Sequence, residues 1–201
     1  MTWTTLTEAN FNDIYAESRW NNQVKGNLEH IRDNVVEIPL PMISALSPLS
    51  GITPAAMSQV ESSASNPKPN FLIHSADDSS DEGLQWQVVV PALYGTGGTL
   101  QVKYYKSSGT TGAVVFAAQI AAVSDDEIIT SKAYDSVNTV TDTVPSTAGY
   151  VTTADITLTN RDSMAAGDLV NVYLYRDANN GSDTTIGDVN IVSARILGQI
   201  A

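Results

Sequence analysis

Short runs that alternate hydrophobic with polar residues, or are continuously apolar, fill the C-terminal part of the chain, from residue 71 to residue 201. They read "LQWQVVVPAL", "TLQVKYYKS", "AVVFAAQIAAV", "SVNTVTDTV", "VTTADITLT", "LVNVYLYRD" and "DVNIVSARILGQI". Thr, Val, Ile and Tyr, which favour a half-buried pleated surface, dominate these runs. Turn-forming segments such as "SSGTTG", "PSTAGY" and "DANNGSD" separate them. This regular spacing predicts a mainly β domain, an antiparallel β-sandwich for which the jelly-roll is the preferred topology.

The hydrophobic positions of residues 1–36 follow a different spacing and predict an N-terminal helical segment. Thr7 can cap the start of the helix, and from Val24 onward the apolar residues lie four, three and four positions apart, as in a heptad seam. Continued backward, this register gives the seam positions Ile14, Asn21, Val24, Leu28, Ile31 and Val35. We expect the seam to join copies of the chain, as a homotrimer; a lone helix that packs on its own domain is the alternative.

Residues 37–70 contain six of the eight prolines of the chain, which excludes a continuous helix. Charged residues are rare among them and comprise only Glu37, Glu61 and Lys68. The part from residue 58 to residue 70, "SQVESSASNPKPN", has the polar composition of a flexible linker. We therefore predict that an extended, Pro-rich arm of residues 37–70 connects the helix to a sandwich domain of residues 71–201.

The first part of this arm is apolar, unlike a linker that only provides reach. Its hydrophobic side chains, which are costly to leave in water, are Ile38, Leu40, Met42, Ile43, Leu46, Leu49, Ile52 and Met57. An arm that lies in a groove of a neighbouring polypeptide accounts for both these side chains and the irregular backbone. We predict a partner interface along this segment; an arm that folds back over its own domain is the alternative.

The net charge of −12 and the pI of about 4.3 argue against nucleic acid as a partner, since phosphate binding needs clustered Lys and Arg. The sequence contains no run of about eighteen apolar residues, so we expect no membrane-spanning helix. It contains no cysteine, which excludes disulfides and thiolate metal sites.

Residues that could perform catalysis are few. The two histidines, His30 and His74, have no partner at a catalytic spacing, and no GxSxG or HExxH motif occurs. The segments "ADDSSDEG" and "SDDE" could supply paired carboxylates for glycoside hydrolysis, but charged runs between strands are normally solvated loop tips. We expect a protein that is not an enzyme, with no catalytic residue and no cofactor.

The segment "DANNGSD" carries oxygen ligands on alternate residues, Asp177, Asn179 and Asp183, with a glycine for the turn, and so superficially resembles a calcium loop. The distal bidentate glutamate is missing, and Asn-Gly is itself a strong hairpin signal. We favour a plain turn and predict no metal site.

Short motifs at both ends of the chain resemble tailed-bacteriophage virion structural proteins. Near the start these motifs comprise Trp3, Leu6, Thr7, Asn10 and the triplet Arg32-Asp33-Asn34. The run "GDLVNVYLYRDANNGSDTTIGDVNIVSARI" is similar to the last two strands of sandwich domains in phage-encoded surface proteins. One departure is the order Asn27-Leu28, where such helices commonly place Leu-Asn.

This resemblance implies a structural protein on the exterior of a virion. The first hypothesis is a capsid decoration, or cement, protein that binds the major capsid protein or another virion protein through its helix and apolar arm. The alternative is a tail-fibre or receptor-binding protein whose sandwich binds a host surface glycan. In the second case sugars would stack on exposed loop aromatics, for which Tyr94, Tyr134 and Tyr150 are the candidates.

Overall fold

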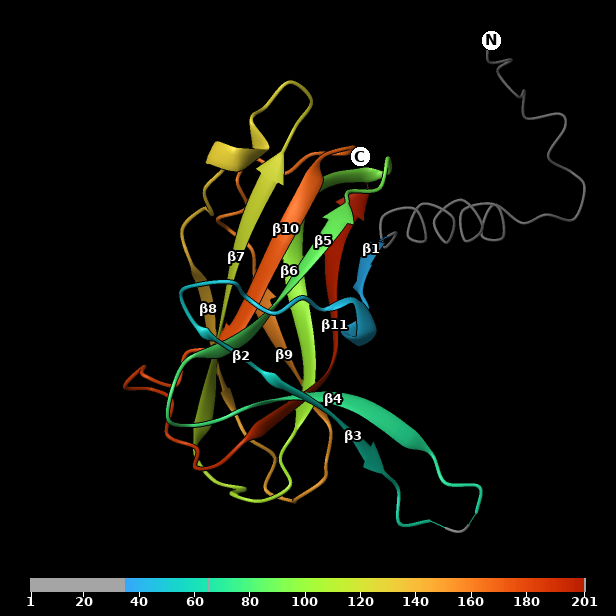
Figure 1. Ribbon diagram of the computed structural model, residues 1–201, viewed down its shortest axis with the longest axis vertical. Helices are drawn as coiled ribbons and strands as arrows, with labels where there is room; N and C mark the ends of the chain where they lie inside the picture. The colour runs from blue at the N-terminus through green and yellow to red at the C-terminus, as the bar shows by residue number, and fades with distance from the viewer. Residues whose placement is uncertain (1–34, 65, 201) are drawn as a thin grey trace, which may run out of the picture. The chain divides into compact units, whose positions relative to one another are not determined.

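The computed structural model describes residues 35–64 and 66–200, which form two β-sheets packed face to face (Figure 1). The strands of sheet A are β1 (Val35–Leu40), β3 (Ala56–Glu61), β4 (Asn70–Ala76), β6 (Tyr94–Tyr105), β9 (Thr152–Thr157) and β11 (Val189–Ile200). The strands of sheet B are β2 (Thr53–Pro54), β5 (Glu82–Val89), β7 (Ala113–Val123), β8 (Asn138–Thr143) and β10 (Leu169–Arg176). Two short 3-10 helices, η2 (Met42–Ser44) and η3 (Ile129–Ser131), lie in the connections.

The strand order follows a nested pairing. Sheet A has the order β3-β4-β11-β6-β9, with β1 also paired to β11, and sheet B has the order β2-β5-β10-β7-β8. Strand β7 therefore pairs with β8, β6 with β9, β5 with β10 and β4 with β11, all antiparallel. Such nesting is the winding of a jelly-roll. The predicted mainly β sandwich of jelly-roll type is confirmed.

Alternation along the strands fills the space between the sheets. On β10, Val170, Val172 and Leu174 are buried, because every second side chain of a strand points to the same face. The largest hydrophobic side chains of this core include Trp86, Leu100, Tyr104, Phe116, Ile120, Ile156 and Leu158. Each side chain of this kind contributes about 1.5–3 kcal/mol on burial.

The start of the predicted arm is part of the sandwich. Ile38 and Leu40 are 2% and 1% exposed, and with the buried Met42 they belong to the core of their own domain. The prediction that these three residues face a partner is therefore wrong. Pro39 led to the prediction of an irregular backbone. Strand β1 accommodates this proline because it lies at a sheet edge, where one side of the backbone needs no hydrogen-bond partner.

The chain after β1 joins the two sheets. The indole nitrogen Nε1 of Trp86, on β5, donates to the carbonyl oxygen of Pro41 at 3.0 Å. On the opposite sheet, Nε2 of His74 on β4 donates to the carbonyl oxygen of Met42 at 3.1 Å. Two adjacent residues of the arm thus satisfy polar groups from both sheets, which ties this segment to its own domain.

The other predicted interface residues fall into three groups. Ile14, Asn21, Val24, Leu28 and Ile31 lie outside the described residues. Val35, predicted on the helix, instead begins strand β1 with an exposed side chain, since pairing with Gln199 extends the backbone there. In the middle of the arm, Ile43, Leu46 and Leu49 are exposed and Ile52 is half-buried.

Where the sequence predicts a flexible linker, the structure has a β-hairpin. Strand β3 pairs antiparallel with β4, from the pair Ala56–Ser75 to the pair Glu61–Asn70. Figure 1 shows this hairpin extending beyond the rest of the sandwich. Its far end carries an ion pair between Lys68 Nζ and Glu61 Oε1 at 2.9 Å. In the described part of the chain, no helix has the length and hydropathy needed to cross a membrane.

Candidate functional site

The outer face of sheet B carries a row of aromatic and amide side chains. Asn171, Tyr173 and Tyr175 of β10 point outward, because the residues that alternate with them fill the core. In the register of the sheet, Tyr173 lies opposite Gln85 of β5 on one side and Gln119 of β7 on the other. One transverse row of the sheet therefore reads Gln, Tyr, Gln.

A third tyrosine reaches this row from a loop. Tyr134, between η3 and β8, donates its hydroxyl to Oδ1 of Asn171 at 2.6 Å. Its ring stacks on that of Tyr173, with centroids 5.5 Å apart and planes inclined by 30°. The rings of Tyr173 and Tyr175 are 5.4 Å apart. Three tyrosines thus form one continuous aromatic surface.

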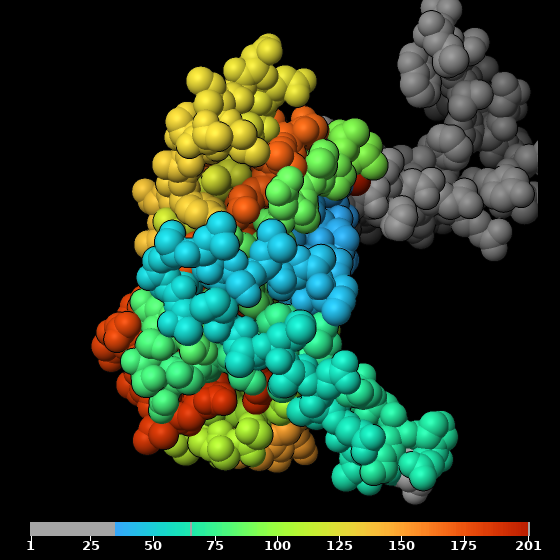
Figure 2. Space-filling view, viewed as in Figure 1, coloured from blue at the N-terminus to red at the C-terminus, as the bar shows by residue number. Residues whose placement is uncertain are grey.

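The chain segment of residues 47–52, here called the strap, borders this surface. It is held at one end by two backbone hydrogen bonds between Leu46 and Gln85, at 2.7 and 3.0 Å, and at the other by Thr53 N donating to the carbonyl oxygen of Asp81. Gly83 lets the strap lie close to β5, because a Cβ there would stand 2.8 Å from Cδ1 of Ile52. Figure 2 shows the strap in cyan and the loop of residues 124–135 in yellow on the same face.

Two hollows lie on this face: one between the strap and Tyr134 of the loop, and one between the loop and strands β5, β7 and β10. The larger, of about 500 Å³, is lined by the strap, Asp81, the two glutamines and the three tyrosines. The smaller, of about 200 Å³, is lined by residues that include Gln87, Lys132, Tyr134 and Asn171. Since Tyr134 lines both, we treat them as one site and call it the sheet B groove.

The hydroxyl of Tyr173 has a special position in this groove. The residue is only 8% exposed, and its hydroxyl has no hydrogen-bond partner among the residues that the structure describes. Burial, together with Tyr134, Tyr175 and the carboxylate of Asp81, raises the pKa of Tyr173 to about 12. The hydroxyl is therefore neutral at physiological pH and free to donate or accept.

The end of the groove near η3 carries three carboxylates and one lysine, Lys132. Lys132 Nζ lies 3.0 Å from Oε2 of Glu127 and 3.1 Å from Oδ2 of Asp162. The hydrogen bonds that Lys132 donates to these carboxylates raise its pKa. Asp135 stands nearby and accepts hydrogen bonds from the backbone N–H groups of Asp162 and Ser136, which lower its pKa. The lysine is thus committed to carboxylates of its own chain.

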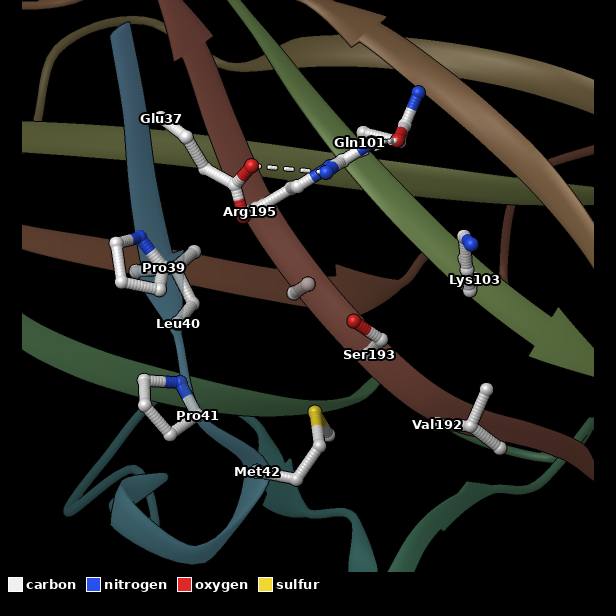
Figure 3. A pocket seen from close by; sticks show the side chains of 11 residues that line it. Glu37, Pro39, Leu40, Pro41, Met42, Gln101, Lys103, Val192, Ser193 and Arg195 are labelled. Carbon is white, nitrogen blue, oxygen red and sulfur yellow. Dashed lines mark hydrogen bonds and ion pairs between the residues drawn. The ribbon is translucent and has the colours of Figure 1, made fainter.

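A hollow of about 280 Å³ also occurs on the outer face of sheet A (Figure 3). Three of its polar side chains bond to one another: Arg195 donates to Oε2 of Glu37 at 2.9 Å and to Oε1 of Gln101 at 2.7 and 2.9 Å. Gln101 in turn donates to Asp155 at 3.0 Å. No aromatic side chain lines this hollow in the described structure. The sheet B groove is therefore the better candidate site.

The structure brings only one of the three predicted loop tyrosines to the groove. Tyr94 is buried in the core, where its hydroxyl donates to the carbonyl oxygen of Gly97. Tyr150 is 66% exposed on another loop. Of these three loop tyrosines, Tyr134 is the one that lines the groove. Sequence reasoning missed Tyr173 and Tyr175, although the alternation in "LVNVYLYRD" places both on the polar side of β10.

The residues considered for calcium have other partners. Arg176, fully buried, donates to both carboxylate oxygens of Asp183 at 2.8 and 3.0 Å, and Val115 N donates to Oδ2 as well. Asn179 donates to Asp81 from its backbone and its side chain. Among residues 35–64 and 66–200, no group of three His, Asp or Glu could hold a metal ion.

The acidic segment of residues 77–82 organises its own loop. The carboxylate of Asp77 accepts from the backbone N–H groups of Ser79 and Ser80, and Asp78 accepts from Gly187 N at 2.7 Å. Glu82 accepts from the backbone of Asp77, and burial raises its pKa. These carboxylates serve as caps for neighbouring backbone groups.

Solved structures with a similar fold share little sequence with this chain. A carbohydrate-binding module of the β-sandwich superfamily has 12% identity and a TM-score of 0.37, over 83% of this chain and 55% of that chain. A xylan-binding module has 17% identity and a TM-score of 0.36, over 82% and 97%. A protein of infectious bursal disease virus has 10% identity and a TM-score of 0.35, over 84% and 34%. This chain spans about half the length of the first protein, and each likeness concerns the fold alone.

No family model and no curated protein sequence matches this chain. The resemblance to phage virion proteins accordingly remains a prediction.

Proposed function

We propose that this chain is a non-enzymatic, glycan-binding β-sandwich and that the sheet B groove is its binding site. The observation that carries this proposal is the stacked cluster of Tyr134, Tyr173 and Tyr175, flanked by the amides of Gln85 and Gln119 in one hollow. This proposal corresponds to the glycan-binding alternative of the sequence analysis. It differs in placing the binding site on a sheet face and not at the loop tips.

The chemistry of the groove suits a sugar. A pyranose presents C–H groups on its ring faces, which pack on aromatic rings, and hydroxyls at its edge, which need donors and acceptors. The amides of Gln85 and Gln119, in one row with Tyr173, and that of Asn171, in the next row, can supply both. Gln119 also donates to the carbonyl oxygen of Asp135, and Asn171 accepts from Tyr134. The hollow of about 500 Å³ lies in the range of about 300–1,000 Å³ that is typical of small-ligand sites.

The test is a glycan array followed by calorimetric titration of the oligosaccharides that bind. The variant Tyr134→Ala removes one ring from the cluster and should weaken binding about tenfold or more, by the usual value of a stacked aromatic pair plus its buried area. The matched control is Tyr150→Ala, which removes an exposed tyrosine outside the groove and should leave affinity unchanged. Equal loss in both variants, or no binding on the array, would contradict the proposal.

A second candidate function is a structural role on a phage particle, as a decoration protein bound to the major capsid protein. Support comes from the arm, where Ile43, Leu46 and Leu49 are exposed, with Leu49 wholly so. Apolar surface of this kind contributes about 25 cal/mol per Å² when a partner covers it. Heat resistance of capsids with and without the protein, and with Leu49→Ser, tests this; capsids that neither bind it nor gain resistance would remove the candidate.

A further inference from the structure

We infer that the sheet B groove selects uncharged oligosaccharide chains and rejects acidic ones, such as uronates and sialylated or sulfated glycans. This inference rests on the proposed function and names the class of ligand. Three features of the groove carry it: the charges along its walls, the hydroxyl of Tyr173 and the way in which its two hollows meet.

The two hollows of the groove are lined by one carboxylate, Asp81, and one ammonium group, Lys132. Three further carboxylates, Glu127, Asp135 and Asp162, line an adjoining hollow at the η3 end together with Lys132. That cation already contacts two carboxylates of its own chain. A ligand carboxylate or sulfate would lose water and meet no free cation in return, which makes its burial costly. Like charges across an interface also suppress the wrong partner.

The floor of the groove offers neutral hydrogen-bonding groups instead. Gln85, Gln119 and the hydroxyl of Tyr173 form one row, and the hydroxyl is buried without a partner among the described residues. A buried hydroxyl that lacks a partner costs free energy, which a ligand regains by bonding to it. A sugar hydroxyl fits this role, because it donates and accepts and carries no charge.

The shape of the groove favours a chain over a single sugar. Tyr134 lines both the hollow of about 500 Å³ and that of about 200 Å³. A ligand that fills both would contact this residue from two sides. We therefore expect affinity to rise from the monosaccharide to the tetrasaccharide.

The experiment compares pairs of sugars that differ only in charge. The probes are β-1,4-linked tetrasaccharides of glucose, mannose and galactose, together with the same three tetrasaccharides oxidised to carboxylates at C6. Each is titrated calorimetrically into the full-length protein at low and at physiological salt. We expect at least one neutral sugar to bind, its oxidised form to bind at least tenfold more weakly, and added salt to narrow this gap.

Two variants locate the effect. Tyr134→Ala should weaken binding of the neutral sugar, which shows that it occupies the groove. Asp81→Asn removes the carboxylate from the larger hollow and should improve binding of the oxidised sugar about threefold or more, while the neutral sugar changes less. The hydrogen bonds that the Asp81 carboxylate accepts from Asn179 are exposed, so the variant should still fold.

The possible results separate the two proposals. An oxidised sugar that binds as tightly as its neutral form, with the same sensitivity to Tyr134→Ala, would overturn the inference and leave glycan binding in place. Binding that is insensitive to Tyr134→Ala would overturn the assignment of the site and the inference with it. Absence of binding by all six sugars would overturn both the inference and the proposed function.

Discussion

The two outer faces of the sandwich have the same backbone pattern but treat their polar side chains in opposite ways. On sheet A, Arg195 bonds to Glu37 and Gln101, and Gln101 bonds to Asp155, so that four strands supply one another's partners. On sheet B, the hydroxyl of Tyr173 is buried between neighbouring rings and has no partner among the described residues. The Arg195 network thus pairs its polar groups within sheet A, whereas sheet B carries a hydroxyl that no described residue pairs.

This difference shows how one fold separates support from recognition. Cross-strand polar pairs on the face of sheet A contribute modestly to stability and need nothing from outside. The aromatic row of sheet B carries a buried, unpaired hydroxyl, a local cost that is common at functional sites. The arm contributes to both faces, since β1 borders the sheet A hollow and the strap borders the groove.

The largest effect should come from the part of the arm that supports sheet A. Leu40→Ala removes a core side chain that is 1% exposed and should lower the free energy of unfolding by about 2–5 kcal/mol. Its control, Leu49→Ala in the strap, truncates a fully exposed side chain and should change it by less than about 0.5 kcal/mol. Urea denaturation measures both. If both variants lose similarly little free energy of unfolding, the first part of the arm is not packed in the core of its own domain.

The next prediction concerns two variants that each lose one tyrosine hydroxyl and should change the free energy of unfolding in opposite directions. Tyr173→Phe removes an unpaired hydroxyl and should raise the free energy of unfolding by about 1 kcal/mol, while glycan affinity falls about threefold to tenfold. Tyr104→Phe, in the core, removes a hydroxyl that donates to Asp142 at 2.7 Å and should lower stability by about 1 kcal/mol or more without an effect on affinity. If both variants are destabilised, Tyr173 has no unmet bond and the contrast between the two faces fails.

A smaller effect is expected on the face of sheet A. Glu37→Gln breaks the ion pair with Arg195, whose side chain is 37% exposed, so the cost should be about 0.2–1 kcal/mol. Glycan affinity should stay the same, because Glu37 lines the other hollow. Thermal unfolding and titration with the best-binding sugar measure the two quantities. Loss of binding here would move the site to sheet A.

A last effect is a dependence on alkaline pH. The pKa of Tyr173 is raised from 10.0 to about 12 mainly by burial, so the folded state holds its proton longer than the unfolded state. The stability linked to this group is therefore complete below about pH 10 and is lost as the pH rises toward 12. Denaturation at pH 9, 10 and 11 measures this dependence: the free energy of unfolding should fall less steeply with pH in Tyr173→Phe than in the unchanged protein. Parallel curves would place Tyr173 in contact with water.

Much of the fold could be predicted because its signal is local. Alternation such as that of "LVNVYLYRD" follows directly from the two-residue period of a strand, and it holds in β10. The arm could not be assigned in this way. Its prolines exclude a helix and a central strand, but they do not distinguish a free segment from an edge strand, which needs hydrogen bonds on one side only. Val35, placed on the helix by its spacing, belongs to that edge strand.

The groove depended on information that no local pattern contains. Tyr134 could be suspected as a loop aromatic, but its ring meets Tyr173 only because the chain between β7 and β8 returns over sheet B. Gln85 and Gln119, 34 positions apart in the sequence, flank Tyr173 through strand register alone. Neither glutamine stood out from other polar strand residues.

The β-sandwich, the two sides of its strands and the acidic character of the chain could be predicted from the residues, because side-chain periodicity and charge are properties of the chain alone. The packing of the first part of the arm into its own core, and the meeting of three tyrosines and two glutamines in one groove, became visible in the folded molecule. Strand order and register bring these residues together, and both result from long-range hydrogen bonds and packing between segments that are distant in the sequence.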